Sequence, residues 1–92
     1  MEDLFLHVNK PSDIRTQIGE FVKLMRSSKG ISQHDLASEL NLSRLTIQKI
    51  ESGKNFNIDT LLLIFQYFDV LNSLSNFISE QEVEFKEIKS FY

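Results

Sequence analysis

The sequence predicts an all-α fold of five helices in one small domain. Between residues 11 and 78, apolar side chains recur every three or four positions, which is the spacing of one helix face. Capping residues and glycines separate these segments, and 92 residues leave room for one domain. We therefore expect an N-terminal arm over residues 1–11, a helical domain over 12–78 and an acidic tail over 79–92.

The first helix is expected over residues 11–30. Pro11, followed by Ser12 or Asp13, is a typical start, and Gly30 supplies a left-handed stop. The apolar residues between them fall on a single stripe: Ile14, Ile18, Phe21, Val22 and Met25.

Two short helices joined by three residues are expected between Ser32 and Lys54. Ser32 with Asp35 forms a variant capping box for the first of them, and Ser43 caps the second. Asn41 ends the first because asparagine tolerates the left-handed conformation, and Gly53 ends the second. The expected inner faces are Leu36, Ala37 and Leu40 in the first helix and Ile47 and Ile50 in the second.

The C-terminal half predicts two more helices and an ambiguous end. Asn57 caps "IDTLLLIFQYF", and "VLNSLSNFI" continues with helical spacing as a short fifth helix. In "SEQEVEFKEIKSFY", Glu82 and Lys86 favour a helix, whereas the alternation of "EVEF" favours an extended form. We expect this tail to be mobile, or ordered only against a partner.

The N-terminal segment "LFLHV" alternates with period two. That pattern favours a short extended arm that pairs with a strand, for example in a second copy, and a loosely packed terminus is the alternative.

Composition excludes several classes of protein. The chain has no cysteine, its two histidines are far apart, and no run reaches the ~20 apolar residues of a membrane span. No nucleophile with a base, metal-ligand set or glycine-rich phosphate loop is present, so we expect no enzyme and no cofactor. Because no membrane span is present, we expect a cytoplasmic protein. The net charge of −3 is uneven: residues 10–54 carry eight bases and five acids, and residues 69–92 carry five acids and two bases.

The stretch "SQHDLASELNLSRLTIQKIESGK" resembles the helix-turn-helix of the phage repressor and Cro family, also called the xenobiotic-response-element family. Gln33, small Ala37 and the apolar residues around the turn match position by position, with Asn41 where the family usually has glycine. The resemblance implies a five-helix domain whose second and third helices form the motif. It also implies an ion pair between Arg26 and Glu51.

The same resemblance implies that the third helix reads DNA. An exposed face suited to a major groove needs donors for guanine or adenine and apolar groups for thymine methyls. The predicted DNA-binding residues are Gln33, Ser43, Arg44, Leu45, Thr46, Gln48, Lys49 and Lys54. Of these, Arg44 would favour guanine and Leu45 a thymine methyl, whereas Gln33, Ser43 and Lys54 resemble positions that hold phosphates.

Family members bind double-stranded DNA as dimers with two recognition helices about 34 Å apart. The apolar surplus after Ile58 is where we expect a homodimer interface. The leading hypothesis is a sequence-specific, homodimeric regulator, most simply a repressor. A softer resemblance to the antitoxins that pair with HipA-type kinases gives the alternative, an autoregulatory antitoxin that also binds a toxin or kinase-like protein.

Overall fold

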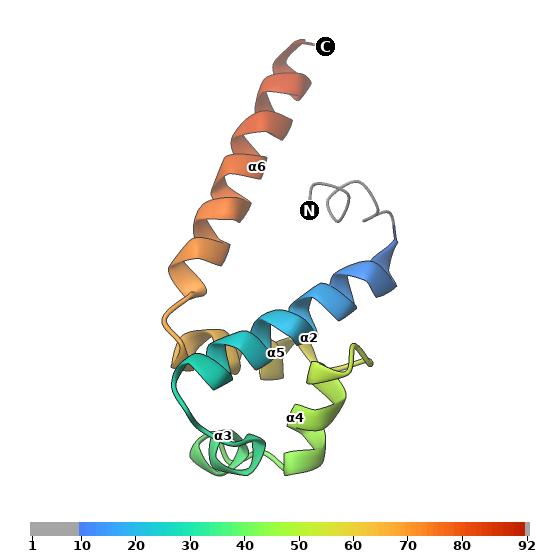
Figure 1. The fold of residues 1–92 in the computed structure, drawn as a ribbon. Coiled ribbons are helices and arrows are strands. Elements are labelled where there is room, and N and C mark those ends of the chain that lie inside the picture. Colours follow the sequence, from blue (N-terminus) through green and yellow to red (C-terminus); the bar gives the residue numbers. More distant parts are fainter. Residues whose placement is uncertain (1–9, 92) are drawn as a thin grey trace.

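The computed structural model describes residues 10–91, and this part of the chain is helical without a strand. In Figure 1 the helices of residues 11–67 gather into a compact body, and the C-terminal helix stands out from it. The helices are α2 (Pro11–Ser28), α3 (Gln33–Glu39), α4 (Arg44–Glu51), α5 (Ile58–Tyr67) and α6 (Leu71–Phe91). The predicted all-α, five-helix fold is confirmed, and the predicted arm "LFLHV" lies outside the described residues.

Helices α2 and α4 approach each other closely, and this approach depends on Gly19. A Cβ atom at this position would lie 2.4 Å from the carbonyl oxygen of Ile50, far inside van der Waals contact. Because Gly19 is buried and has no side chain, the backbones of the two helices can cross there. This contact sets the position of α4 relative to α2.

The core lies where α2, α3, α4 and α5 meet. Its buried apolar residues are Val22, Met25, Leu36, Ala37, Ile47, Ile50, Leu61, Ile64, Phe65 and Phe68. All five residues predicted to face inward on the two central helices are buried or, for Leu40, packed against this cluster. Burial of these side chains is the main term that holds the four helices together.

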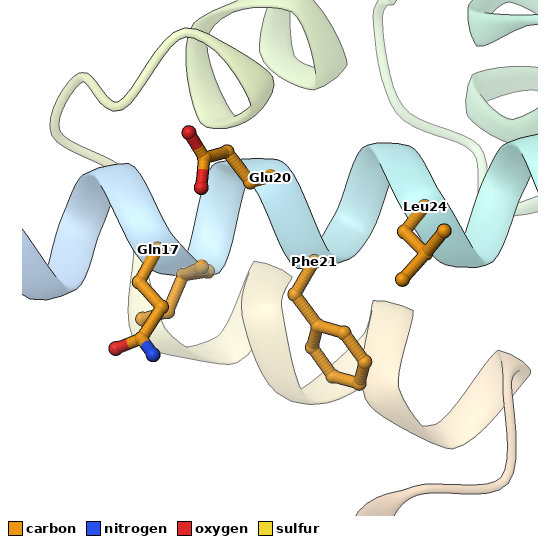
Figure 2. A pocket seen from close by; sticks show the side chains of 5 residues that line it. Gln17, Glu20, Phe21 and Leu24 are labelled. Atoms are coloured by element: carbon orange, nitrogen blue, oxygen red, sulfur yellow. The ribbon is translucent and has the colours of Figure 1, made fainter. Parts of the chain in front are cut away.

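The apolar stripe predicted on α2 is buried along only part of its length. Ile14 is 41 % exposed and Phe21 is 38 % exposed, because α4 and α5 cover only part of the stripe. The ring of Phe21 meets the edge of Phe65 at 5.8 Å. Figure 2 shows Gln17, Phe21 and Leu24 pointing to the same side of α2, where they line an apolar hollow of about 420 Å³.

The predicted caps and turns between the helices are confirmed. The hydroxyl oxygen of Ser32 accepts from the amide of Asp35 at 3.0 Å, and the Asp35 carboxylate accepts from the amide of Ser32. Asn41 has φ 56°, in the left-handed region, which directs the chain from α3 into α4. Gly30 at φ 68° and Gly53 at φ 81° end α2 and α4 in the same way.

Helix α6 is much longer than the predicted fifth helix. It runs without a break from Leu71 to Phe91, across the boundary expected at residue 78. The helical interpretation of "SEQEVEFKEIKSFY" was therefore the correct one of the two alternatives. Only the start of α6, with Leu71 and Leu74, packs against the body, and the rest projects away from it (Figure 1).

Candidate nucleic-acid interface

Helix α4 begins at a tightly bonded cap. The hydroxyl oxygen of Ser43 accepts from the amide of Thr46 at 3.1 Å and lies 2.9 Å from the Thr46 hydroxyl. This cap fixes the first turn of α4 and with it the side chains of Arg44 and Leu45. Because the Thr46 hydroxyl is engaged by the cap and the residue is half-buried, its methyl group is the part left for an apolar contact.

The two faces of α4 separate as the sequence predicts. Ile47 and Ile50 are fully buried against the core, which fixes the rotation of the helix about its axis. Leu45 is 57 % exposed, and Arg44 and Lys49 are exposed as well. An apolar residue between two cations on a solvent-facing helix offers donors for guanine and a contact for a thymine methyl.

An ion pair ties α4 to α2. The Nε of Arg26 donates to one carboxylate oxygen of Glu51 at 2.7 Å, and its Nη2 donates to the other at 3.0 Å. The Nη1 of Arg26 donates to the carbonyl oxygen of Ile31 at 2.9 Å, in the loop before α3. The amide nitrogen of Gln33 donates to Glu51 at 3.0 Å. This network joins α2, α3 and α4, and it confirms the predicted ion pair.

The network also changes the acidity of its members. Burial raises the pKa of Glu51, but hydrogen bonds from Arg26 and Gln33, together with the charges of Arg26 and Lys23, outweigh burial. The pKa of Glu51 therefore lies below its ordinary value. The hydrogen bond with Glu51 raises the pKa of Arg26. Both groups are charged at neutral pH, so the pair stays formed there.

The loop after α4 is held in place by two hydrogen bonds, one from its backbone and one from a side chain of α2. The amide of Lys54 donates to the carbonyl oxygen of Lys49 at 3.0 Å, and the Nε of Arg15 donates to the carbonyl oxygen of Gly53 at 3.4 Å. Lys54 is exposed and lies three residues after Glu51, the last residue of α4. Its charge is thus available next to α4, as a phosphate contact requires.

The eight predicted DNA-binding residues occupy four places. Arg44, Leu45 and Lys49 lie on the exposed face of α4, whereas Ser43 and Thr46 are used by its cap. The half-buried amide of Gln33 is bound to Glu51, and Gln48 is exposed beside that network. Lys54 follows the helix. The structure adds Lys23 of α2 as a candidate, because it shares a hollow with Gln33 and Gln48, although it has no signature in the helix-turn-helix pattern.

Comparison with known proteins identifies the family. A model described as a helix-turn-helix domain matches residues 19–77, which include the described helices α3, α4 and α5. The chain belongs to this helix-turn-helix family. The resemblance to repressor and Cro proteins is confirmed at this level.

Two curated relatives each match part of the chain. The HTH-type transcriptional activator BcrR of Enterococcus faecalis is 32 % identical over 68 residues, which are 73 % of this chain and 32 % of BcrR. A protein of Methanocella arvoryzae, named as an HTH-type transcriptional regulatory protein, is 41 % identical over 51 residues, which are 55 % of this chain and 16 % of that protein. The chain thus spans about a third or less of the length of each relative.

Among the described residues, no helix combines the length and apolar character that a membrane crossing requires.

Proposed function

We propose that this protein is a sequence-specific, DNA-binding transcriptional regulator that inserts α4 into the major groove. The observation that carries the proposal is the exposed face of Arg44, Leu45 and Lys49 on a helix whose opposite face is locked into the core. Such a face supplies hydrogen-bond donors and an apolar contact on a single helix, which is what the major groove admits. Both curated relatives are named as transcriptional regulators, which supports the same function.

The proposed role of each residue follows its place in the structure. Arg44 donates to a guanine, Leu45 and the methyl of Thr46 contact thymine methyls, and Lys49 reaches a guanine or a phosphate. Ser43 and Lys54 contact phosphates at the two ends of α4. Gln33 and Gln48 extend the contact surface toward α2.

We infer that the regulator acts as a homodimer, with α6 as the main dimer contact. Ile78, Phe85 and Ile88 are 49 %, 68 % and 53 % exposed, and with Gln81 they continue the stripe that Leu71 and Leu74 begin. The spacing alternates between three and four residues, which is the spacing of helices that pair side by side. An apolar stripe of this length on a projecting helix is more stable when a second copy covers it.

The dimer contact can be tested with two matched variants. Ile88 lies on the stripe, whereas Val83, with a similar exposure of 55 %, lies on the opposite side of α6. We expect Ile88→Glu to give monomers in sedimentation equilibrium and Val83→Glu to leave the dimer intact. Equal effects of both variants, or a monomeric wild type at tens of micromolar, would contradict the assignment of this stripe.

A repressor is the simplest form of regulator, because a dimer on an operator blocks polymerase without further contacts. The experiment that tests the function is selection of bound sequences from random duplex DNA at physiological salt. We expect a palindrome whose half-sites are about one helical turn apart. A reporter placed behind this palindrome then distinguishes repression from activation. Failure to enrich any sequence would contradict the proposal.

The second candidate function is an antitoxin that also binds a toxin or kinase-like protein. The exposed apolar hollow on α2, with Phe21 and Leu24, is a surface that such a partner could cover (Figure 2). Purification from the native host, followed by mass spectrometry of the proteins that co-purify, tests this alternative. A stoichiometric kinase-like partner would favour the antitoxin.

A further inference from the structure

A polar hollow of about 430 Å³ lies between α2 and the helix-turn-helix. Its lining residues are Lys23, Arg26, Gln33, Gln48, Glu51 and Ser52. We propose that this hollow binds a phosphodiester group of the DNA backbone and that Lys23 supplies its positive charge. This inference rests on the proposed function and adds to it a contact from a helix outside the helix-turn-helix.

The charges in the hollow favour an anion. All three nitrogens of the Arg26 guanidinium donate within the protein, two of them to Glu51 and one to the carbonyl oxygen of Ile31. Arg26 and Glu51 therefore neutralise each other. Lys23 is exposed and makes no hydrogen bond within residues 10–91, and its charge acts on Glu51 without a direct contact. With Arg26 and Glu51 it leaves the hollow with one excess positive charge.

Two neutral amides supply hydrogen-bond donors beside this charge. One N–H of the Gln33 amide is bound to Glu51, and its second N–H remains for a ligand. The Gln48 amide makes no hydrogen bond in the described part of the chain, so both of its N–H groups are available. A cation with two amides is a set of groups that binds a phosphate oxygen well and a positively charged ligand poorly.

The position of the hollow assigns it to the DNA backbone rather than to base edges. The major groove is about 12 Å wide and admits a single helix, so α2 stays outside when α4 enters. Phosphates line both edges of the groove, and elements beside the recognition helix meet them. Gln48 lies on α4 and Lys23 on α2, so the hollow bridges the inserted helix and the scaffold at such an edge.

The test measures how operator affinity changes with salt in three variants. Replacing Lys23 by alanine removes the proposed phosphate contact, and replacing Gln48 by glutamate places a carboxylate in the hollow. Lys86→Ala is the control, because it removes the same charge from α6, where Lys86 is exposed and does not line the hollow. Thermal unfolding of each variant verifies that the fold is retained.

The expected result is a change in salt dependence without a change in sequence preference. Loss of one phosphate contact per bound copy lowers the slope of log affinity against log salt by about 0.9. Between 50 and 200 mM salt, Lys23→Ala should therefore lose about 3.5-fold less affinity per copy than wild type. Gln48→Glu should weaken binding as well, and Lys86→Ala should keep the wild-type slope.

Several outcomes would overturn the inference. Equal slopes for Lys23→Ala and Lys86→Ala would show a general charge effect, and altered base preference in Lys23→Ala would show a base contact. If the wild-type protein binds no DNA, an NMR titration with inorganic phosphate tests the anion site independently of DNA binding. A shift of the Gln48 side-chain amide that Lys23→Ala abolishes supports the anion site while the proposed function fails, and no shift contradicts the anion site.

Discussion

Removing the carboxylate of Glu51 is expected to loosen α4 from the scaffold. Glu51→Ala deletes two hydrogen bonds from Arg26 and one from Gln33. The side chains of Arg26 and Glu51 are only 13 % and 5 % exposed, so the arginine that remains is poorly hydrated. Loss of one partner of a buried pair costs about 3–5 kcal/mol, and the residual exposure of Arg26 places this case near about 3 kcal/mol.

The assay is chemical and thermal unfolding of a double-mutant cycle. Glu51→Ala should lower the melting temperature by on the order of 10–20 °C in a domain of this size. Arg26→Ala should cost a similar amount, because it leaves a carboxylate buried without a cation. The double mutant should lose less than the sum of the single mutants, with a coupling of about 1–3 kcal/mol.

A matched surface variant controls for the loss of an acid as such. Glu39 is exposed on α3, and Glu39→Ala should change the free energy of unfolding by less than about 0.5 kcal/mol. Additive losses in the cycle, or a loss from Glu51→Ala no larger than that from Glu39→Ala, would refute the reasoning.

Three further predictions follow from the same packing. Because the pKa of Glu51 is lowered in the folded state, its contribution to stability is complete above the unfolded value of about 4.3 and falls as the pH drops through the folded value. Glu51→Gln should therefore flatten the acid limb of a stability–pH profile, and an unchanged limb would count against the pair. Gly19→Ala should destabilise the domain by about 2 kcal/mol or more in urea unfolding, because its Cβ meets the carbonyl oxygen of Ile50; a neutral effect would mean that the helices can shift apart. Asn41→Gly should be neutral or stabilising, whereas Asn41→Ala should cost about 1 kcal/mol, because residue 41 has φ 56°; equal effects would contradict a left-handed turn.

The helix-turn-helix could be predicted because its signals are local. The caps at Ser32 and Ser43 and the left-handed Asn41 each act within a few residues, so they are legible in the sequence. The inward face of Ile47 and Ile50 follows from helical spacing alone. These features together fix which side of α4 is exposed.

The features that the sequence did not reveal depend on contacts between distant segments. Nothing in the sequence near Gly19 shows that the backbone of Ile50 will lie so close that a Cβ atom at residue 19 would not fit. Nothing near Lys23 shows that it will line the same hollow as Gln48. The length of α6 was ambiguous because the alternation in "EVEF" competes with the spacing of Glu82 and Lys86. Distances between helices, rather than patterns along one, decide such cases.

The most direct test of DNA reading by α4 is base-preference measurement with Arg44→Ala and Lys54→Ala on the selected operator at stated salt. If Arg44 contacts a guanine, Arg44→Ala should cost about 1–3 kcal/mol per half-site and relax the preference at one base pair. Lys54→Ala should weaken binding to all sequences alike and lower the salt slope by about one unit. Wild-type base preferences in Arg44→Ala would contradict the assignment of this face as the recognition surface.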